Sequence, residues 1–243
     1  MDRGTVPPLR SLPRCFVLGL EPEEEVIELP TEEIDKFRKV LRLGTGDEVA
    51  VLPNDGVSVW RCRLDGRRAV VEEKVQESNE AKNPVIVAQA LPKPDKLDEV
   101  VRMGTEMGVQ EFWLFPTERT VVRWDAKKTE DRIRRLEKIA REAAEVSFRT
   151  RLPRIQLLKS LDEVLELAGP HVLVLSELEC VQESLAEALP AAGVPVVLVI
   201  GPEGGWTRAE VQKIGDRGVT LGPRVLRVDT AAACAVALAI QRK

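Results

Sequence analysis

The stretch Val-Leu-Val-Ile-Gly-Pro-Glu-Gly-Gly-Trp occupies residues 197–206 and decides the fold. Its four leading apolar residues show no polar alternation, which is typical of a strand buried on both faces of a sheet. The glycines that follow allow a tight turn and a close approach of the backbone to a ligand. Thr207 and Glu210 then match a capping box, which predicts that a helix begins directly after the turn.

A second stretch, Leu-Gly-Pro-Arg-Val-Leu-Arg-Val-Asp-Thr-Ala at residues 221–231, has the same order of strand, stiff loop and helix. Gly222 and Pro223 fix a sharp exit from the strand, and Asp229 or Thr230 is the predicted N-cap of the final helix. Two such loops can wall a nucleotide-sized pocket with backbone groups. We therefore expect a cofactor site made of main chain rather than of titratable side chains.

Spacing alone leaves plainer interpretations open. The first stretch can be an ordinary strand-to-helix turn, and the second can be a capped C-terminal helix packed through its alanines. The first stretch lacks the GxGxxG pattern of dinucleotide-binding folds and the Lys-Ser/Thr of a P-loop. Pro202 also removes one N–H donor, which suits a rigid pocket wall better than an anion-binding loop.

Residues 84–243 alternate between strand and helix patterns, which predicts an α/β domain with a mainly parallel sheet. Its expected strands are residues 85–90, 111–115, 154–158, 172–175, 194–200 and 219–221. Its expected helices are residues 95–107, 127–146, 161–167, 181–189, 208–216 and 230–242. Asp95 marks the predicted start of the first of these helices.

Residues 1–83 have a different pattern, with short β-type runs at residues 14–18, 48–52, 57–64 and 69–75 separated by turn signals. One helix is expected from Thr31, its predicted N-cap, to about residue 41. Several short strands with one helix suggest a small barrel. A polar segment at residues 77–84 ends in proline and is typical of a linker, so two domains, 1–83 and 84–243, are expected.

Composition narrows the function classes. The apolar fraction of 44% predicts a true core, and the net charge of −4 indicates that any binding of nucleic acid depends on local patches. The four cysteines, Cys15, Cys62, Cys180 and Cys234, are widely spaced and His171 is the single histidine, so neither a metal site nor a disulfide scaffold is expected. Without an apolar run of spanning length or a secretory signal, the sequence predicts a soluble cytoplasmic protein with no membrane partner.

Several motifs together resemble those of the RsmE family, the 16S ribosomal RNA uracil-N3 methyltransferases of the SPOUT superfamily. The two loops are similar to its GPEGG and LGxRILRxETA motifs, which a helix beginning Ser/Thr-x-x-Glu separates. Further matches follow in the right order at residues 40–47, 93–96, 104–109, 116–119 and 139–149. The similarity covers nearly the whole chain.

The chain departs from the family pattern at four positions. Asp229 stands where the family has Glu, and Lys36 where it often has His. Val146 stands where Gln is usual and Phe148 where Gly is usual, near the expected RNA side. The departures at Val146 and Phe148 concern target recognition and leave the cofactor loops unchanged.

The resemblance implies a SPOUT domain with a deep trefoil knot, preceded by a PUA-like β-barrel that helps to hold RNA. It implies S-adenosylmethionine as cofactor, 16S rRNA of the small ribosomal subunit as partner, and a homodimer. The cofactor-binding residues that it implies are Leu175, Ser176, Ile200, Gly201, Pro202, Gly204, Gly205, Leu221, Gly222, Leu226, Arg227, Thr230 and Ala231.

The implied reaction is transfer of a methyl group from a sulfonium to uracil N3, which must lose its proton. Such a reaction needs aligned substrates and either a base or a cation that stabilises the uracil anion. Glu203 and Asp229 are the candidate bases and Arg227 is the candidate anion stabiliser. Glu203 can instead be a carboxylate favoured by a helix N-terminus, and Asp229 a simple N-cap.

A locally basic stretch, residues 127–154, holds ten Lys/Arg and five Asp/Glu. Its basic side chains can contact phosphates, although a solvated helix with i,i+4 ion pairs explains the charge equally simply. With the family resemblance, the predicted RNA-binding residues are Arg42, Lys93, Arg119, Arg123, Arg149 and Arg151. Arg38, Arg61 and Arg63 join Arg42 in a second candidate patch.

Two other functions stay open from the sequence. The chain can be a SPOUT methyltransferase with another target RNA, such as tRNA. It can also be a non-catalytic RNA-binding protein of ribosome assembly, although such a protein has no need of both glycine-containing loops.

Overall fold

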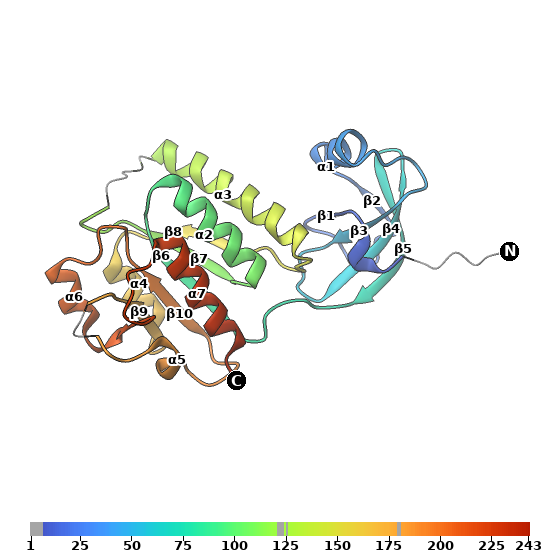
Figure 1. The fold of residues 1–243 in the computed structure, drawn as a ribbon. Coiled ribbons are helices and arrows are strands. Elements are labelled where there is room, and N and C mark those ends of the chain that lie inside the picture. Colours follow the sequence, from blue (N-terminus) through green and yellow to red (C-terminus); the bar gives the residue numbers. More distant parts are fainter. Residues whose placement is uncertain (1–6, 121–123, 125, 179–180) are drawn as a thin grey trace. The chain divides into compact units, whose positions relative to one another are not determined.

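The computed structural model describes residues 7–120, 124, 126–178 and 181–243. The chain forms two compact units, Met1–Glu80 with Ala144–Arg151 and Ala81–Ala143 with Leu152–Lys243. They are named the first and the second unit (Figure 1).

The second unit is built on a six-stranded sheet in which every pairing is parallel. The strand order is β11-β9-β10-β6-β7-β8. The bounds are β6 Val85–Ala90, β7 Glu111–Phe115, β8 Arg154–Leu157, β9 Val172–Leu175, β10 Val196–Ile200 and β11 Gly218–Val219. The prediction of a mainly parallel sheet is confirmed, and all five residues of β10 are buried, as its unbroken apolar run predicted.

Helices cover both faces of this sheet, which is why its strands are apolar on both sides. Leu97, Leu136 and Ala235 belong to one buried cluster, and Trp113, Val164 and Ile214 belong to a second. The helices are α2 Pro94–Met107, α3 Ala126–Val146, α4 Leu161–Ala168, α5 Leu185–Ala188, α6 Arg208–Ile214 and α7 Val228–Gln241, with a 3-10 turn η3 at Gly215–Arg217. Helices α2 and α7 pack against each other on the face of the sheet that holds the first of these two clusters (Figure 1).

The predicted helix starts in the second unit are partly wrong. Helix α2 begins at Pro94 with Lys93 as N-cap, because proline is preorganised for the first helical position. Helix α7 begins at Val228 with Arg227 as N-cap, so neither Asp229 nor Thr230 caps it. Helix α5 has four residues instead of the expected nine, because the capping box begins only at Ser184. The expected capping box of α6 at Thr207 is confirmed.

The first unit contains a five-stranded sheet of order β1-β3-β4-β5-β2. The bounds are β1 Arg14–Phe16, β2 Val26–Glu28, β3 Glu48–Leu52, β4 Ser58–Asp65 and β5 Arg68–Gln76. All pairings are antiparallel except β1 with β3, and the sheet curls around a buried cluster that includes Phe37 and Val51. Strand β2 was not predicted, because its three residues end the acidic stretch at residues 21–28 and two of them are exposed.

The helical segment of the first unit also differs from its prediction. The unit opens with a 3-10 turn, η1 at Leu9–Ser11. Pro30, not Thr31, is the N-cap of α1 Thr31–Asp35, which continues as a π-helix, η2 at Lys36–Val40. Proline at the N-cap supplies no side-chain hydrogen bond, so the helix start carries no sequence signal of the usual kind.

Residues 144–151 pack with the first unit although they follow the first part of the second unit in sequence. Lys36 Nζ lies 2.8 Å from Glu145 Oε2, and the Arg14 guanidinium lies 4.5 Å from the centre of the Phe148 ring. The Arg149 guanidinium is paired with Glu80. These contacts combine one half-buried and one buried ion pair with a cation–π contact, and they give Phe148 a packing role inside the first unit.

Candidate functional site

A pocket of about 470 Å³ opens at the carboxyl ends of β9, β10 and β11 in the second unit. Ligands of open parallel sheets bind at this edge. Twelve of the thirteen predicted cofactor residues line the pocket, namely Leu175, Ser176, Ile200, Gly201, Pro202, Gly204, Gly205, Leu221, Gly222, Leu226, Arg227 and Ala231. The exposed side chain of Thr230 is not among the lining residues.

The first wall of the pocket is the glycine turn after β10, and Trp206 fixes it. The Trp206 indole N–H donates to the Leu175 carbonyl at 2.9 Å, so it ties the turn to the end of β9. A Cβ on Gly201 would lie 3.1 Å from this ring, which is tighter than ordinary packing. Gly205 has φ +66°, a backbone conformation that favours glycine. Glycine is therefore favoured at Gly201 by the close Trp206 ring and at Gly205 by its backbone conformation.

The loop that carries Arg119 is tied to the same wall. Glu210, which caps α6, also accepts a hydrogen bond from the Glu118 backbone N–H at 3.2 Å. Arg119 then reaches over the turn, and its Nη1 donates to the Gly204 carbonyl at 2.6 Å. The predicted RNA-binding residue Arg119 thus lies at the pocket.

The second wall is the loop between β11 and α7. The Thr220 backbone N–H donates to the Glu183 carbonyl at 2.9 Å, which extends the edge of the sheet beyond β11. The Gly222 N–H donates to Thr220 Oγ1 at 3.1 Å, and Gly222 has φ +103°. The loop is therefore a tight turn held by the Thr220 hydroxyl, which also donates to the Gly222 carbonyl, and its sharp bend is the one that the Gly222-Pro223 pair predicted.

The three candidate catalytic residues lie at different places around the pocket. Glu203 and Arg227 line it, and the Glu203 carboxylate accepts a hydrogen bond from the Lys93 backbone N–H at 3.0 Å. Asp229 does not line the pocket and pairs with Lys96, whose Nζ lies 2.8 Å from Asp229 Oδ2. The hydrogen bond from Lys96 holds the pKa of Asp229 below its ordinary value, which makes this carboxylate a weaker proton acceptor.

Basic side chains outnumber acidic ones around the pocket. The basic lining residues are Lys93, Lys96, Arg119, Arg224 and Arg227, and the acidic ones are Glu177 and Glu203. Apolar side chains and backbone groups form most of the remaining wall. This arrangement suits a ligand with a flat neutral part held by backbone, beside a second ligand that carries negative charge.

Residues 79–240 match the family of RNA methyltransferase domains. The ribosomal RNA small subunit methyltransferase E of Bacillus subtilis is 34% identical over 229 residues, which cover 86% of this chain and 89% of that protein. The protein of the same name from Synechocystis is 36% identical over 236 residues, which cover 92% of this chain and 76% of that protein. The chain belongs to this methyltransferase E family.

Two solved structures have the same fold. A ribosomal RNA small subunit methyltransferase E from Neisseria gonorrhoeae, bound to S-adenosylmethionine, has a TM-score of 0.81 at 24% identity over 93% of this chain and 95% of that one. A methyltransferase from Legionella pneumophila, in complex with the same cofactor, has a TM-score of 0.85 at 24% identity over 94% of this chain and 96% of that one.

In this methyltransferase E chain, the predicted RNA-binding residues differ in exposure. Arg42, Lys93, Arg119 and Arg151 have exposed side chains, whereas Arg123 lies outside the described residues. The Arg149 side chain is 2% exposed and forms an ion pair with Glu80, so its guanidinium does not face a surface that RNA can reach. We therefore correct its predicted role from phosphate contact to a buried structural ion pair.

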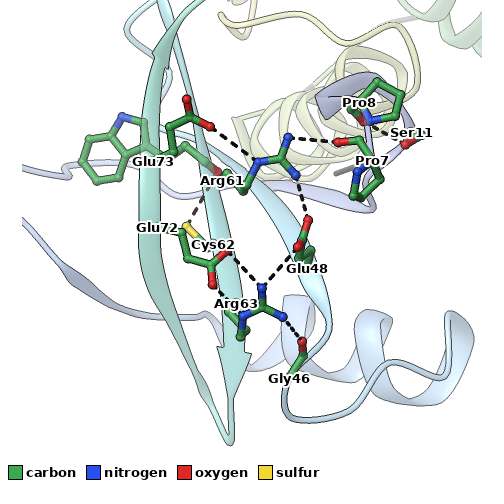
Figure 2. A network of polar contacts seen from close by, with 11 residues as sticks. Pro7, Pro8, Ser11, Gly46, Glu48, Arg61, Cys62, Arg63, Glu72 and Glu73 are labelled. Carbon is green, nitrogen blue, oxygen red and sulfur yellow. Dashed lines mark hydrogen bonds and ion pairs between the residues drawn. The ribbon is translucent and has the colours of Figure 1, made fainter. Parts of the chain in front are cut away.

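The second candidate patch is also corrected in part, as Figure 2 shows. Arg61 is 8% exposed, and its guanidinium pairs with Glu48 and donates to the Pro7 carbonyl. Arg63 is paired with Glu72 and with the same Glu48. These carboxylates neutralise both arginines, so the pair holds β3, β4 and β5 together instead of forming a basic surface.

Sequence reasoning missed Trp206, Glu210 and Lys96 as parts of the site. Trp206 directly follows the glycine turn, and its position next to that turn was the available signal. Within the described residues, no group of three or more His, Cys, Asp or Glu side chains is placed to hold a metal ion. No helix in the described part of the chain is long and apolar enough to cross a membrane.

The replacement Trp206→Phe is expected to lower the free energy of unfolding by about 1–3 kcal/mol, because the buried Leu175 carbonyl loses its donor. Urea titration measures this loss. Trp113→Phe is the matched control, because the indole of Trp113 donates to a half-buried Glu111 carboxylate that water can also solvate. Equal losses in the two variants would contradict the role assigned to the Trp206 hydrogen bond.

Proposed function

We propose that this chain methylates N3 of a specific uridine in 16S rRNA of the small ribosomal subunit, with S-adenosylmethionine as methyl donor. The observation that carries the proposal is the pocket between two backbone loops, in a chain that belongs to the methyltransferase E family. Such a substrate places the activity in the cytoplasm.

The residues around the pocket fit the proposed cofactor. A Cβ on Gly205 would lie 3.3 Å from Glu177 Oε1, so a larger residue here would crowd a carboxylate that lines the pocket. The adenine would be held by backbone groups of the two loops, with Leu226 against one of its faces. The end of β9 at Leu175 and Ser176 supports a third side. When bound, the cofactor supplies an electrophilic methyl group on a positively charged sulfur.

The reaction breaks the sulfur–methyl bond and forms a bond from uracil N3 to the methyl carbon, while the N3 proton passes to a base. The chain must hold the two reactants in line and stabilise the negative charge that forms on the uracil. We assign charge stabilisation to Arg227, whose exposed side chain lines the pocket. Glu203 is the better candidate base, because the ion pair with Lys96 lowers the pKa of Asp229.

Binding of RNA is assigned to exposed basic residues. Lys93 and Arg119 line the pocket, where the target nucleotide would enter. In the first unit, Arg42 and Arg151 are exposed and available to phosphates. A flipped uridine read on its Watson–Crick edge is the expected mode, because N3 is paired and inaccessible in a duplex.

We also propose the finer features of the fold that the family resemblance implies. The second unit would carry the deep trefoil knot of SPOUT domains, and the first would be a PUA-like barrel that holds RNA. The domain division at residues 83 and 84 belongs to the same proposal. Two chains would associate as a homodimer.

Methyl transfer to small subunits tests the proposal. Labelled S-adenosylmethionine is incubated with the chain and with small subunits that lack this modification, and the digested nucleosides are analysed by mass spectrometry. The proposal predicts 3-methyluridine in the 16S rRNA. A different methylated nucleoside would reject the N3 assignment, and transfer only to tRNA would reject the target.

A further inference from the structure

Lys96 is a charged residue that lines the pocket but lies outside the two backbone loops. It lies in the first turn of α2, lines the pocket and has a side chain that is 28% exposed. Its Nζ lies 2.8 Å from Asp229 Oδ2, in the first turn of α7. The ion pair therefore joins the N-terminal turns of two helices that pack against each other.

Stability alone does not explain a cation at this place. The N-terminus of a helix carries a partial positive charge, which favours acidic residues and disfavours lysine. Asp229 is favoured in the first turn of α7 whether or not a lysine is present, whereas Lys96 needs Asp229 to offset its unfavourable position. A function that requires positive charge in the pocket explains why lysine occupies this turn.

The Lys96 ammonium also has donors to spare. An ammonium group has three N–H donors, and within the described residues Asp229 is the one partner found for them. Arg119, by comparison, already donates to the Gly204 carbonyl of the first wall. Lys96 is therefore a half-buried cation, held by Asp229 and able to donate to a ligand.

We propose that Lys96 donates a hydrogen bond to an anionic oxygen of a bound ligand, and that Asp229 is the positioning residue that orients it. The inference rests on the proposed function, which supplies two such oxygens. One belongs to the carboxylate of the amino-acid end of the cofactor, and the other is the uracil oxygen that becomes negative as N3 loses its proton. Partial burial strengthens either interaction.

The test compares Lys96→Met, which removes the charge, with Lys159→Met, which removes an exposed lysine outside the pocket. Calorimetry measures the binding of S-adenosylhomocysteine and of 5′-methylthioadenosine, which lacks the amino-acid end. If Lys96 binds the cofactor carboxylate, Lys96→Met weakens binding of the first compound by about tenfold or more and leaves the second unchanged.

Single-turnover methyl transfer at saturating cofactor tests the second candidate for the anionic oxygen, which is the uracil oxygen. If Lys96 stabilises the uracil oxygen, Lys96→Met binds both compounds normally but transfers the methyl group about a hundredfold more slowly. Lys96→Arg keeps the positive charge, so we expect it to retain most of the affinity or of the transfer rate that Lys96→Met loses. This variant also keeps the test decisive if Lys96→Met does not fold. Lys96→Met with wild-type binding and rate, like Lys159→Met, would overturn the proposal.

Two further variants test the role of Asp229. Asp229→Asn is expected to lower the same affinity or transfer rate that Lys96→Met lowers. Asp229→Glu is expected to retain it, because Glu keeps the negative charge that pairs with Lys96. A purely structural role would lower thermal stability in Asp229→Asn without this selective pattern. If the wild-type chain does not methylate rRNA, the proposed function fails while the two binding titrations still decide the role of Lys96 toward the cofactor.

Discussion

Gly205→Val is expected to weaken binding of S-adenosylhomocysteine by about a hundredfold or more, which corresponds to about 2.7 kcal/mol. Gly205 has φ +66°, and a β-branched residue in this conformation is strained by about 1–3 kcal/mol. The turn can relieve the strain only by moving, and its movement would displace the backbone that forms the pocket wall. Calorimetry with the wild-type and variant chains measures the change.

Gly193→Val is the matched control for this prediction. Gly193 has φ +83°, a Cβ there would meet nothing within 4 Å, and it does not line the pocket. The control therefore carries similar backbone strain in the same unit without touching the wall. We expect both variants to lose stability and only Gly205→Val to lose affinity. Equal affinity in the two variants would show that the glycine turn is not part of the cofactor site.

Glu80→Ala is expected to destabilise the first unit by about 3–5 kcal/mol, because it leaves a buried guanidinium without its carboxylate. Arg149 is 2% exposed, and its Nη2 lies 2.5 Å from Glu80 Oε2. The same carboxylate accepts backbone N–H groups of Thr150 and Arg151. Hydrogen exchange of the β3 and β4 amides in a urea series measures the loss in this unit alone.

Glu28→Ala is the control, because Glu28 pairs with Arg68 on the surface, where such pairs contribute roughly 0–1 kcal/mol. We expect this variant to stay close to the wild type. A loss in Glu80→Ala no larger than that in Glu28→Ala would contradict the buried ion pair. The same result would restore Arg149 as a candidate for contact with RNA.

The sequence was most informative where one local rule determines the structure. The unbroken apolar run ending at Ile200 predicted a buried strand, and Thr207 with Glu210 predicted the start of the next helix. The two loops predicted a pocket walled by backbone because Gly205 and Gly222 require conformations that few other residues adopt. Local chemistry sets these features, so a single sequence carries them.

Features that depend on contacts between distant segments were missed. Arg149 has the same charge as an RNA-binding arginine, and only its burial on Glu80 reveals a structural role. Asp229 has the side chain of an N-cap, but Arg227 occupies that position and Asp229 pairs with Lys96 from another helix. The Trp206 hydrogen bond to Leu175 joins residues that lie 31 positions apart. None of these partners can be read from local spacing.

Chemical-shift mapping with S-adenosylhomocysteine tests the central claim most directly, because it locates the bound cofactor product on the chain. The account predicts saturable shifts at the backbone amides of the two loops, with little change in the first unit; these amides are Ile200, Gly201, Gly204, Gly205, Leu221, Gly222, Arg224, Val225 and Leu226. The Gly205→Val chain should show none of these shifts at the same concentration. Absence of binding to the wild-type chain, or shifts centred away from these two loops, would contradict the account.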